Sequence, residues 1–243
     1  MLQLKELSII ESKEVLLSLP QGKKMINTIN AHSYNTALKD SLFAKALMTC
    51  DALIPDGASI VKACKLLKAK SQPKERIAGW DLFILEMERL NANGGGLCFF
   101  MGSTNEVLSK IKERVAKDYP NIKVKSYSPP YKPQFSEEDN NIIISQINEA
   151  KPNLLWIGMT APKQEKWVYE NWDKLDIECH VGTIGAVFDF YAGTVQRAPL
   201  WWQRHSLEWL YRLLKEPKRM WRRYLIGNSL FLYNILGEKL NCK

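Results

Sequence analysis

The sequence lacks the features of a secreted or membrane-spanning chain. Its first residues, MLQLKELSIIESKEVLLSL, have no basic start followed by an uninterrupted apolar stretch, so we expect no secretion signal. No segment reaches the roughly 18 to 20 consecutive apolar residues of a spanning helix. The five cysteines are odd in number, scattered and without a C-x-x-C pair, which indicates a reducing compartment. These absences predict a cytoplasmic protein that would meet a membrane only from the side.

The sequence also lacks common signatures of cofactor and metal sites. The glycine run at 94–96 precedes a predicted strand, whereas the dinucleotide fingerprint G-x-G-x-x-G follows one, so NAD binding is disfavoured. The three histidines, His32, His180 and His205, have no mutual spacing that suggests a metal site. We therefore expect neither a cofactor nor a metal ion.

Acidic residues are scarce in one segment, 197–224, near the C-terminal end. The whole chain has a net charge of +8, and eight basic side chains of this segment supply much of it: Arg197, Arg204, Arg212, Lys215, Lys218, Arg219, Arg222 and Arg223. Only Glu208 and Glu216 oppose them, which leaves a local excess of +6. Such a cluster indicates an anionic partner, which is a phospholipid surface, a nucleic acid or a phosphorylated substrate.

What is present is an alternation of short apolar runs and longer helical patterns. The predicted strands cover 25–30, 51–55, 95–102, 121–128, 153–159 and 178–183. The predicted helices cover 33–49, 57–69, 79–92, 105–119, 137–150 and 164–175. This order predicts an α/β, Rossmann-like fold with a mostly parallel sheet and helices on both faces. Near residue 195 the pattern gives way to Trp/Arg-rich sequence, so we expect a catalytic domain at 1–195 and a helical, basic and aromatic appendage at 196–243.

Ligands of open α/β sheets bind at the carboxyl ends of the strands, so polar residues in those loops are candidate site residues. Asn30 follows the first predicted strand, where it either caps the next helix or faces a ligand. Asp56 follows the second strand. Its carboxylate either caps the following helix or accepts a proton from a substrate hydroxyl, and spacing alone does not choose between the two.

Two later loops carry weaker signals. Ser103 and Glu106 fit a capping box, and a helix that begins after Gly102 would present free backbone N–H groups to a diphosphate. Gln164 follows a proline at the start of another predicted helix. Its carboxamide can hydrogen-bond a sugar or a uracil-type ligand, or it can simply cap the helix.

Taken in order, seven motifs between about residues 20 and 225 resemble the bacterial WecG/TagA/CpsF glycosyltransferases, family 26. The motifs are Thr28-x-Asn30, PDG with Asp56, RIAGWDLF with Arg76, Gly79 and Asp81, FFMGS with Gly102 and Ser103, APKQEKW with Gln164, VGTIGAVFDFYAGTVQRAPLWW, and LEWLYRLLKEPKRMWRRY. The resemblance implies an inverting enzyme that is associated with the membrane. It would move a sugar, often N-acetylmannosamine, from a UDP donor to an undecaprenyl-diphosphate-linked acceptor in cell-surface polysaccharide or teichoic acid synthesis.

The same resemblance assigns roles to residues of this chain. Asp56 falls on the proposed catalytic base of the family. The positions that fall on substrate-binding residues are Thr28, Asn30, Arg76, Gln164, Arg212, Arg219 and Arg222, and we add Gly79, Asp81, Gly102 and Ser103 from the quoted motifs. Lys74 is close enough to Arg76 to be an alternative cation. Many UDP-sugar enzymes hold a metal with a D-x-D pair, which this sequence lacks, so we expect metal-independent catalysis.

The basic segment permits two interpretations that can both hold. Leu207, Leu210, Tyr211 and Leu214 recur at helical spacing, with basic residues mainly elsewhere around the helix. Such a helix packs its apolar side on the core, or it docks on an anionic membrane and makes the protein peripheral on the inner face of the cell membrane. An exposed apolar face could also be shielded in a homo-oligomer. A nucleic-acid-binding protein is the alternative hypothesis, although the cleft motifs favour the transferase and predict no nucleic acid.

Overall fold

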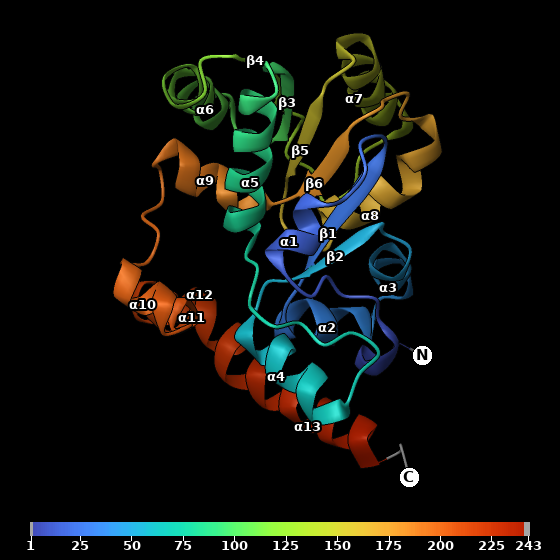
Figure 1. The fold of residues 1–243 in the computed structure, drawn as a ribbon, viewed down its shortest axis with the longest axis vertical. Helices are drawn as coiled ribbons and strands as arrows, with labels where there is room; N and C mark the ends of the chain where they lie inside the picture. The colour runs from blue at the N-terminus through green and yellow to red at the C-terminus, as the bar shows by residue number, and fades with distance from the viewer. Residues whose placement is uncertain (1, 241–243) are drawn as a thin grey trace.

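A single parallel sheet forms the centre of the protein. The computed structural model describes residues 2–240 (Figure 1). The six strands are β1 (Lys24–Ile29), β2 (Ala52–Pro55), β3 (Gly96–Gly102), β4 (Ile122–Tyr127), β5 (Leu154–Gly158) and β6 (His180–Thr183). They lie in the order β2-β1-β6-β5-β3-β4, and every neighbouring pair is parallel. The predicted α/β, Rossmann-like fold is therefore confirmed.

Helices cover both faces of this sheet, as predicted. In the body they are η1 (Leu4–Glu6), α1 (Lys13–Leu17), α2 (Ala31–Ala37), α3 (Ser41–Met48), α4 (Ala58–Leu67), α5 (Gly79–Ala92), α6 (Asn105–Asp118), α7 (Glu137–Ala150), α8 (Lys163–Asn171), η2 (Trp172–Lys174) and α9 (Gly185–Ala192). Strand β3 shows how the faces divide. Cys98 and Phe100 join the core under α5, α6 and α9, while Phe99 and Met101 join the core under α7 and α8. Successive strand residues point to opposite faces, so a strand buried on both sides is apolar throughout.

One expected helix is two. The sequence pattern predicts a single helix over 33–49, whereas α2 ends at Ala37 and α3 begins at Ser41. The break lies at Asp40, whose carboxylate accepts a hydrogen bond from the Phe43 N–H (3.0 Å) and so caps α3. Asp40 also pairs with Lys166 of α8 at 2.9 Å. Helical periodicity continues across the break, but the cap gives α3 its own start.

The C-terminal segment, here called the tail, is helical as expected. It contains α10 (Leu200–Arg204), α11 (Glu208–Lys215), α12 (Pro217–Trp221), the π-helical turn η3 (Arg222–Ile226) and α13 (Gly227–Leu240). An extended segment leads from α9 to α10, and α10 to α12 lie beside the body rather than on the sheet (Figure 1). None of the helices within residues 2–240 is both long and apolar enough to cross a membrane.

The last helix is part of the body's core. Phe231 and Ile235 of α13 are buried in the cluster that α2 and α4 form, and Phe231 meets Tyr34 edge to face at 5.6 Å. The Glu238 carboxylate accepts hydrogen bonds from the Tyr34 hydroxyl (2.7 Å) and from the Leu4 N–H (3.0 Å). The tail thus leaves the body at α10 and returns to it at α13. The division into 1–195 and 196–243 stays a prediction, and 241–243 lie outside the described residues.

Candidate active site

The first two strands bring Asn30 and Asp56 together at the carboxyl edge of the sheet. Strands β1 and β2 pair in register, so that Thr28 lies opposite Ile54 on the neighbouring strand. The Asp56 N–H donates to the Ile29 carbonyl at 2.9 Å. A Cβ at Gly57 would lie 3.4 Å from the Asn30 Cβ, which shows how closely the two loops approach. Neighbouring parallel strands place their following loops side by side, as this edge requires.

The structure separates the capping and chemical interpretations of these two residues. The Asn30 side chain accepts a hydrogen bond from the Ser33 N–H at 3.0 Å and caps α2. Helix α4 has Gly57 at its N-cap position and no side-chain cap. Asp56 is therefore not a helix cap. Its side chain keeps 28% of its exposure, so the carboxylate is not walled in by packing.

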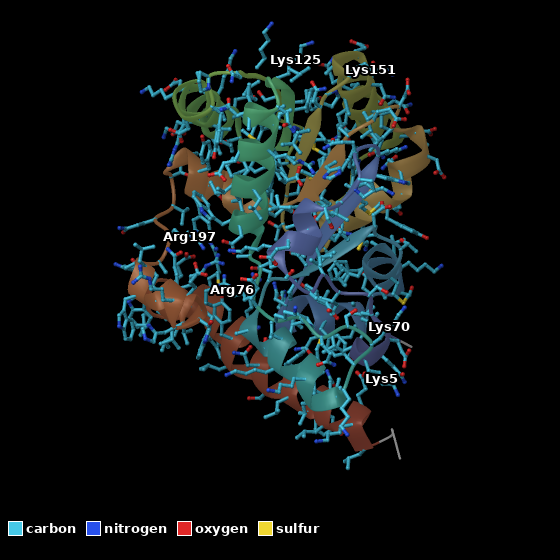
Figure 2. The ribbon with its side chains drawn as sticks, viewed as in Figure 1. Lys5, Lys70, Arg76, Lys125, Lys151 and Arg197 are labelled. Carbon is cyan, nitrogen blue, oxygen red and sulfur yellow. The ribbon has the colours of Figure 1, made fainter. Side chains whose placement is uncertain are left out.

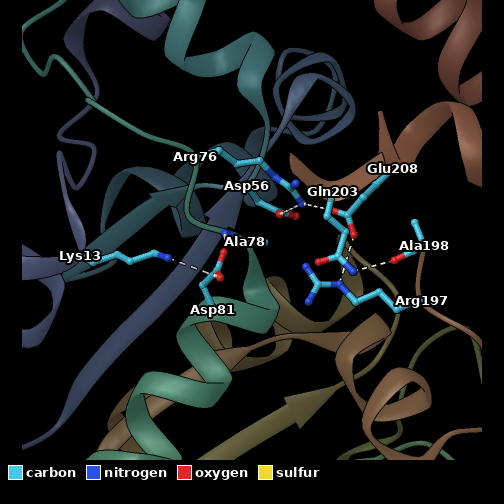
Figure 3. A network of polar contacts seen from close by, with 9 residues as sticks. All are labelled: Lys13, Asp56, Arg76, Ala78, Asp81, Arg197, Ala198, Gln203 and Glu208. Carbon is cyan, nitrogen blue, oxygen red and sulfur yellow. Dashed lines mark hydrogen bonds and ion pairs between the residues drawn. The ribbon is translucent and has the colours of Figure 1, made fainter. Parts of the chain in front are cut away.

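Arg76 is the cation beside Asp56. Its terminal nitrogen lies 3.7 Å from the Asp56 carboxylate (Figure 3). The same terminal nitrogen also forms an ion pair with Glu208, the first residue of α11 in the tail. Glu208 also binds Arg197, whose Nε lies 3.1 Å from the Glu208 carboxylate. Lys74, the alternative cation, is exposed and no ion pair in the described part of the chain joins it to Asp56. The structure places Arg76 at this site.

Both arginines of this network lie on the side of the molecule where the tail begins. Figure 2 shows Arg76 and Arg197 beside α10 and α11, whereas Lys125 and Lys151 lie at the far end of the sheet. The Arg197 guanidinium also lies 5.0 Å from the ring centre of Trp80 on α5. The tail is thereby fastened to the body close to Asp56 by Arg197 and Glu208. Neither residue was expected from the sequence, although Glu208 is one of only two acids in the basic segment.

Gly79 and Asp81 shape the start of α5, three and five residues after Arg76. The Asp81 carboxylate accepts a hydrogen bond from the Ala78 N–H (2.8 Å) and lies 3.6 Å from the Lys13 amine (Figure 3). A Cβ at Gly79 would lie 3.4 Å from an Ile184 methyl, so α5 begins in van der Waals contact with the turn before α9. These contacts fix the loop that carries Arg76. A direct ligand contact of either residue stays a prediction.

Gly102 and Ser103 adopt left-handed backbone conformations at the end of β3. Gly102 has φ +119°, and a Cβ there would lie 2.3 Å from the Gly158 carbonyl oxygen. Ser103 has φ +58°, and its N–H donates to the same carbonyl at 3.1 Å. Only glycine permits this approach at Gly102 without displacing β5. Four strand spacings separate β2 from β3, about 19 Å, so these residues lie far along the edge from Asp56.

The expected capping box at Ser103 and Glu106 is wrong. Thr104 is the N-cap of α6, and its side chain accepts a hydrogen bond from the Val107 N–H at 3.3 Å. Glu106 instead pairs with Lys110 one turn along the helix. The left-handed conformation of Ser103 moves the start of the helix by one residue, a shift that the sequence pattern does not reveal.

Gln164 is buried and ties two loops together. Its side-chain oxygen accepts hydrogen bonds from the Met159 N–H (3.2 Å) and the Gly185 N–H (3.1 Å), and its amide donates to Glu165 at 2.8 Å. These bonds join the end of β5 to the start of α9. Burial raises the pKa of Glu165 to about 7. In this arrangement Gln164 positions the loops, and its contact with a ligand stays a prediction.

The three predicted tail arginines lie in different surroundings. The Arg212 guanidinium lies 5.9 Å from the Phe190 ring, at the end of the body. Arg219 is exposed and pairs with Glu216 at 2.8 Å. Arg222 is exposed and lies 5.3 Å from the Trp221 ring. No hydrogen bond or ion pair in the described part of the chain joins them to Asp56, so their role in binding stays a prediction.

A fourth tail arginine, Arg223, was not predicted from the sequence as a site residue. Its Nε is buried and has no hydrogen-bond partner among the described residues. Burial lowers the pKa of Arg223, and its charge acts on both Asp56 and His32. Arg222 and Arg223 are adjacent and chemically identical, so only the turn of the helix distinguishes the half-buried Arg223 from the exposed Arg222.

The surroundings of Asp56 set its acid strength. Burial is the main cause that raises the pKa of Asp56 to about 6. Arg76 and Arg223 lower the pKa, whereas the carboxylates of Glu208 and Asp81 raise it. A carboxyl group with a pKa near 6 is ionised at neutral pH, yet it is a stronger base than an exposed aspartate. Asp56 is therefore suited to accept a proton.

A parallel α/β sheet that carries an aspartate of raised pKa beside an arginine at its carboxyl edge is typical of an enzyme that acts on an anionic substrate. Comparison of the sequence with known protein families identifies the class of enzyme more closely. The model of the glycosyl transferase WecG/TagA/CpsF family matches residues 2–243, and this chain belongs to that family. It is a glycosyltransferase.

Several named relatives share most of their length with this chain. An N-acetylglucosaminyldiphosphoundecaprenol N-acetyl-beta-D-mannosaminyltransferase of Bacillus subtilis strain 168 is 30% identical over 90% of this chain and 81% of its own length. The enzyme of the same name in Bacillus spizizenii is 32% identical over 85% of this chain and 77% of its own. That of Staphylococcus aureus strain MW2 is 27% identical over 90% and 82%. The family predicted from the motifs is confirmed.

Proposed function

We propose that this enzyme transfers N-acetylmannosamine, or a related hexose, from a UDP-sugar to N-acetylglucosamine on undecaprenyl diphosphate. The relatives' names carry the acceptor and the sugar, and the family supplies the reaction class. The product would enter a cell-surface polysaccharide or a teichoic acid. The observation that carries the proposal is the Asp56 carboxylate, which is partly exposed, is not used as a cap, and has its pKa raised to about 6.

The chemistry requires one base. The acceptor hydroxyl attacks the anomeric carbon from the face opposite UDP, and Asp56 takes the hydroxyl proton as the new carbon–oxygen bond forms. The bond to the UDP oxygen breaks with its electron pair, so the sugar configuration inverts and no covalent intermediate is needed. Removal of such a base costs about two to four orders of magnitude in rate.

The leaving diphosphate gains negative charge and needs donors that are aimed at it. Arg76, which lies 3.7 Å from Asp56, is the first candidate for this role, and Arg212, Arg219 and Arg222 of the tail are further candidates. Arginine binds phosphate oxygens with two parallel N–H bonds, which a helix N-terminus can supplement. In residues 2–240 no three His, Cys, Asp or Glu side chains are grouped to hold a metal ion. We accordingly propose a metal-independent reaction.

The tail also carries the proposed contact with the membrane. Large apolar side chains are exposed along it: Leu200, Trp201, Leu214, Trp221, Leu225, Ile226, Leu232, Tyr233, Leu236 and Leu240. Basic side chains lie among them, and each Lys or Arg near an anionic leaflet adds roughly 1 kcal/mol. Peripheral binding to the inner face of the membrane would bring the lipid-linked acceptor to Asp56. A homo-oligomer that covers the same face is the competing use of this surface.

The test of the function is a donor screen with a short-chain lipid-diphosphate acceptor and a panel of UDP-sugars. We expect N-acetylmannosamine transfer by the wild type, and turnover lowered by about two to four orders of magnitude in Asp56→Asn with donor binding retained. Near-normal turnover in the variant would remove Asp56 from the mechanism. Thermal shifts separate the nucleic-acid alternative, since UDP should raise the melting temperature for a donor site and single-stranded RNA should raise it for a nucleic-acid site.

A further inference from the structure

Glu208 is the acid at which tail and body meet. It comes from the first turn of α11, and its side chain is only 16% exposed. One carboxylate oxygen pairs with Arg76 of the body and the other lies 3.1 Å from Nε of Arg197 (Figure 3). Two cations from different parts of the chain thus converge on a single half-buried carboxylate. An exposed tail helix does not require such an arrangement for its own stability.

The position of Arg76 depends on Glu208. Arg76 contacts Glu208 closely, whereas the Asp56 carboxylate is 3.7 Å away. Asp81, the other nearby acid, is already bound to the Ala78 N–H and to Lys13. Without Glu208, Asp56 would therefore be the remaining acceptor for the Arg76 guanidinium. A closer ion pair than the present one at 3.7 Å would hold Asp56 more firmly in its charged form and weaken it as a base.

We propose that Glu208 is a positioning residue of the transferase site, which draws the Arg76 guanidinium away from Asp56 and leaves that carboxylate free to accept the acceptor's proton. The inference rests on the proposed function, because it takes Asp56 as the base. It gives the tail a part in catalysis that its arginines do not supply, since the acid that positions Arg76 is present only when α11 is docked.

A different role for Glu208 would be to occupy the place of a substrate phosphate on Arg76. The contacts of Glu208 argue against it, because the carboxylate has a second anchor in Arg197, which in turn lies over Trp80 at 5.0 Å. If Glu208 had to give way to a substrate phosphate on each turnover, its carboxylate would break its contacts with both Arg76 and Arg197 each time. The two roles predict opposite kinetics, so one variant distinguishes them.

The test is Glu208→Gln, which removes the charge at nearly constant size. Asp56 is surrounded by the charges of Arg76, Glu208, Arg223 and Asp81, and only the second of these is changed. The negative charge of Glu208 raises the pKa of Asp56, so its removal lowers that pKa. We expect the acidic limb of the kcat profile to move to lower pH, kcat at neutral pH to fall by about tenfold, and the donor KM to change by less than about twofold. Glu208→Asp, which keeps the charge, should restore most of the loss.

Glu216→Gln is the matched control, because it removes the same charge from the same tail at the pair with exposed Arg219. It should leave the pH profile unchanged. A carbon-13 NMR titration of the Asp56 carboxyl group checks the proposal without activity, and a failure of the proposed function would show instead as no transfer by the wild type. An unchanged Asp56 titration in folded Glu208→Gln would overturn the positioning role. So would a lowered donor KM with kcat intact, which would show that Glu208 occupies a phosphate position.

Discussion

Replacement of Asp56 by asparagine should stabilise the protein while it removes activity. Burial is the main cause that raises the pKa of Asp56 from an ordinary value of 3.8 to about 6, despite Arg76 at 3.7 Å. The folded chain therefore binds this proton more readily than the unfolded chain between about pH 4 and pH 6. Stability falls as pH rises wherever the native state binds more protons, so the ionised carboxylate costs stability above pH 6.

The size of this cost follows from the pKa. A rise from 3.8 to about 6 corresponds to about 3 kcal/mol. Water reaches the 28% of the side chain that is exposed and screens part of it, so we expect about 1 to 2 kcal/mol. Asparagine keeps the shape and cannot ionise, and Arg76 keeps its pair with Glu208. The variant should thus be more stable than the wild type by about that amount at pH 7.5.

The measurement is urea unfolding of both proteins at pH 4, 5, 6 and 7.5. The advantage of Asp56→Asn should be smallest at pH 4 and should grow through pH 6 to a plateau. A difference that is constant with pH would show that the carboxyl group is not perturbed by its surroundings. A wild type that gains on the variant as pH rises would show that Arg76 outweighs burial, and the description of Asp56 as a strengthened base would then be wrong.

Further expectations concern catalysis, the membrane contact and the core. Transfer activity should persist in excess EDTA, and its loss with rescue by manganese would contradict metal independence. The rate should rise with pH through a midpoint near 6, where Asp56 ionises, and a flat profile from pH 5 to 7 would contradict a base of that strength. Leu225→Ser with Ile226→Ser, both 54% exposed, should weaken co-sedimentation with anionic vesicles by roughly tenfold or more without lowering the melting temperature. Phe231→Ala should destabilise the fold by about 3 to 5 kcal/mol in thermal unfolding, since that ring is buried against Tyr34, and a loss below about 1 kcal/mol would mean that α13 is not part of the core.

The sheet could be predicted from the sequence because its signals are local. Strand β3 is apolar on both faces, and the amphipathic pattern of α5 and α6 predicts their bounds to within about a residue. Local signals also predicted that Asp56 directly follows β2. They failed where a single side chain ends or starts a helix, as at Asp40, or where the backbone is left-handed, as at Ser103.

The composition of the site depends on contacts across long stretches of chain, which periodicity does not contain. Arg76 and Glu208 are more than a hundred residues apart, and nothing in either segment alone pairs them. Likewise Arg222 is exposed whereas the adjacent Arg223 is partly buried and its charge acts on Asp56, a difference that two neighbouring arginines do not reveal in the sequence. The motif order suggested which residues belong together, but the packing of the tail decides which side chains reach Asp56.

The bond between the Leu4 N–H and the Glu238 carboxylate joins residues 234 positions apart. During synthesis α13 emerges from the ribosome long after α2 and α4, so the apolar surface around Tyr34 stays uncovered until α13 has been made. A ribosome that stalls before α13 would leave this surface exposed and the nascent chain prone to aggregation.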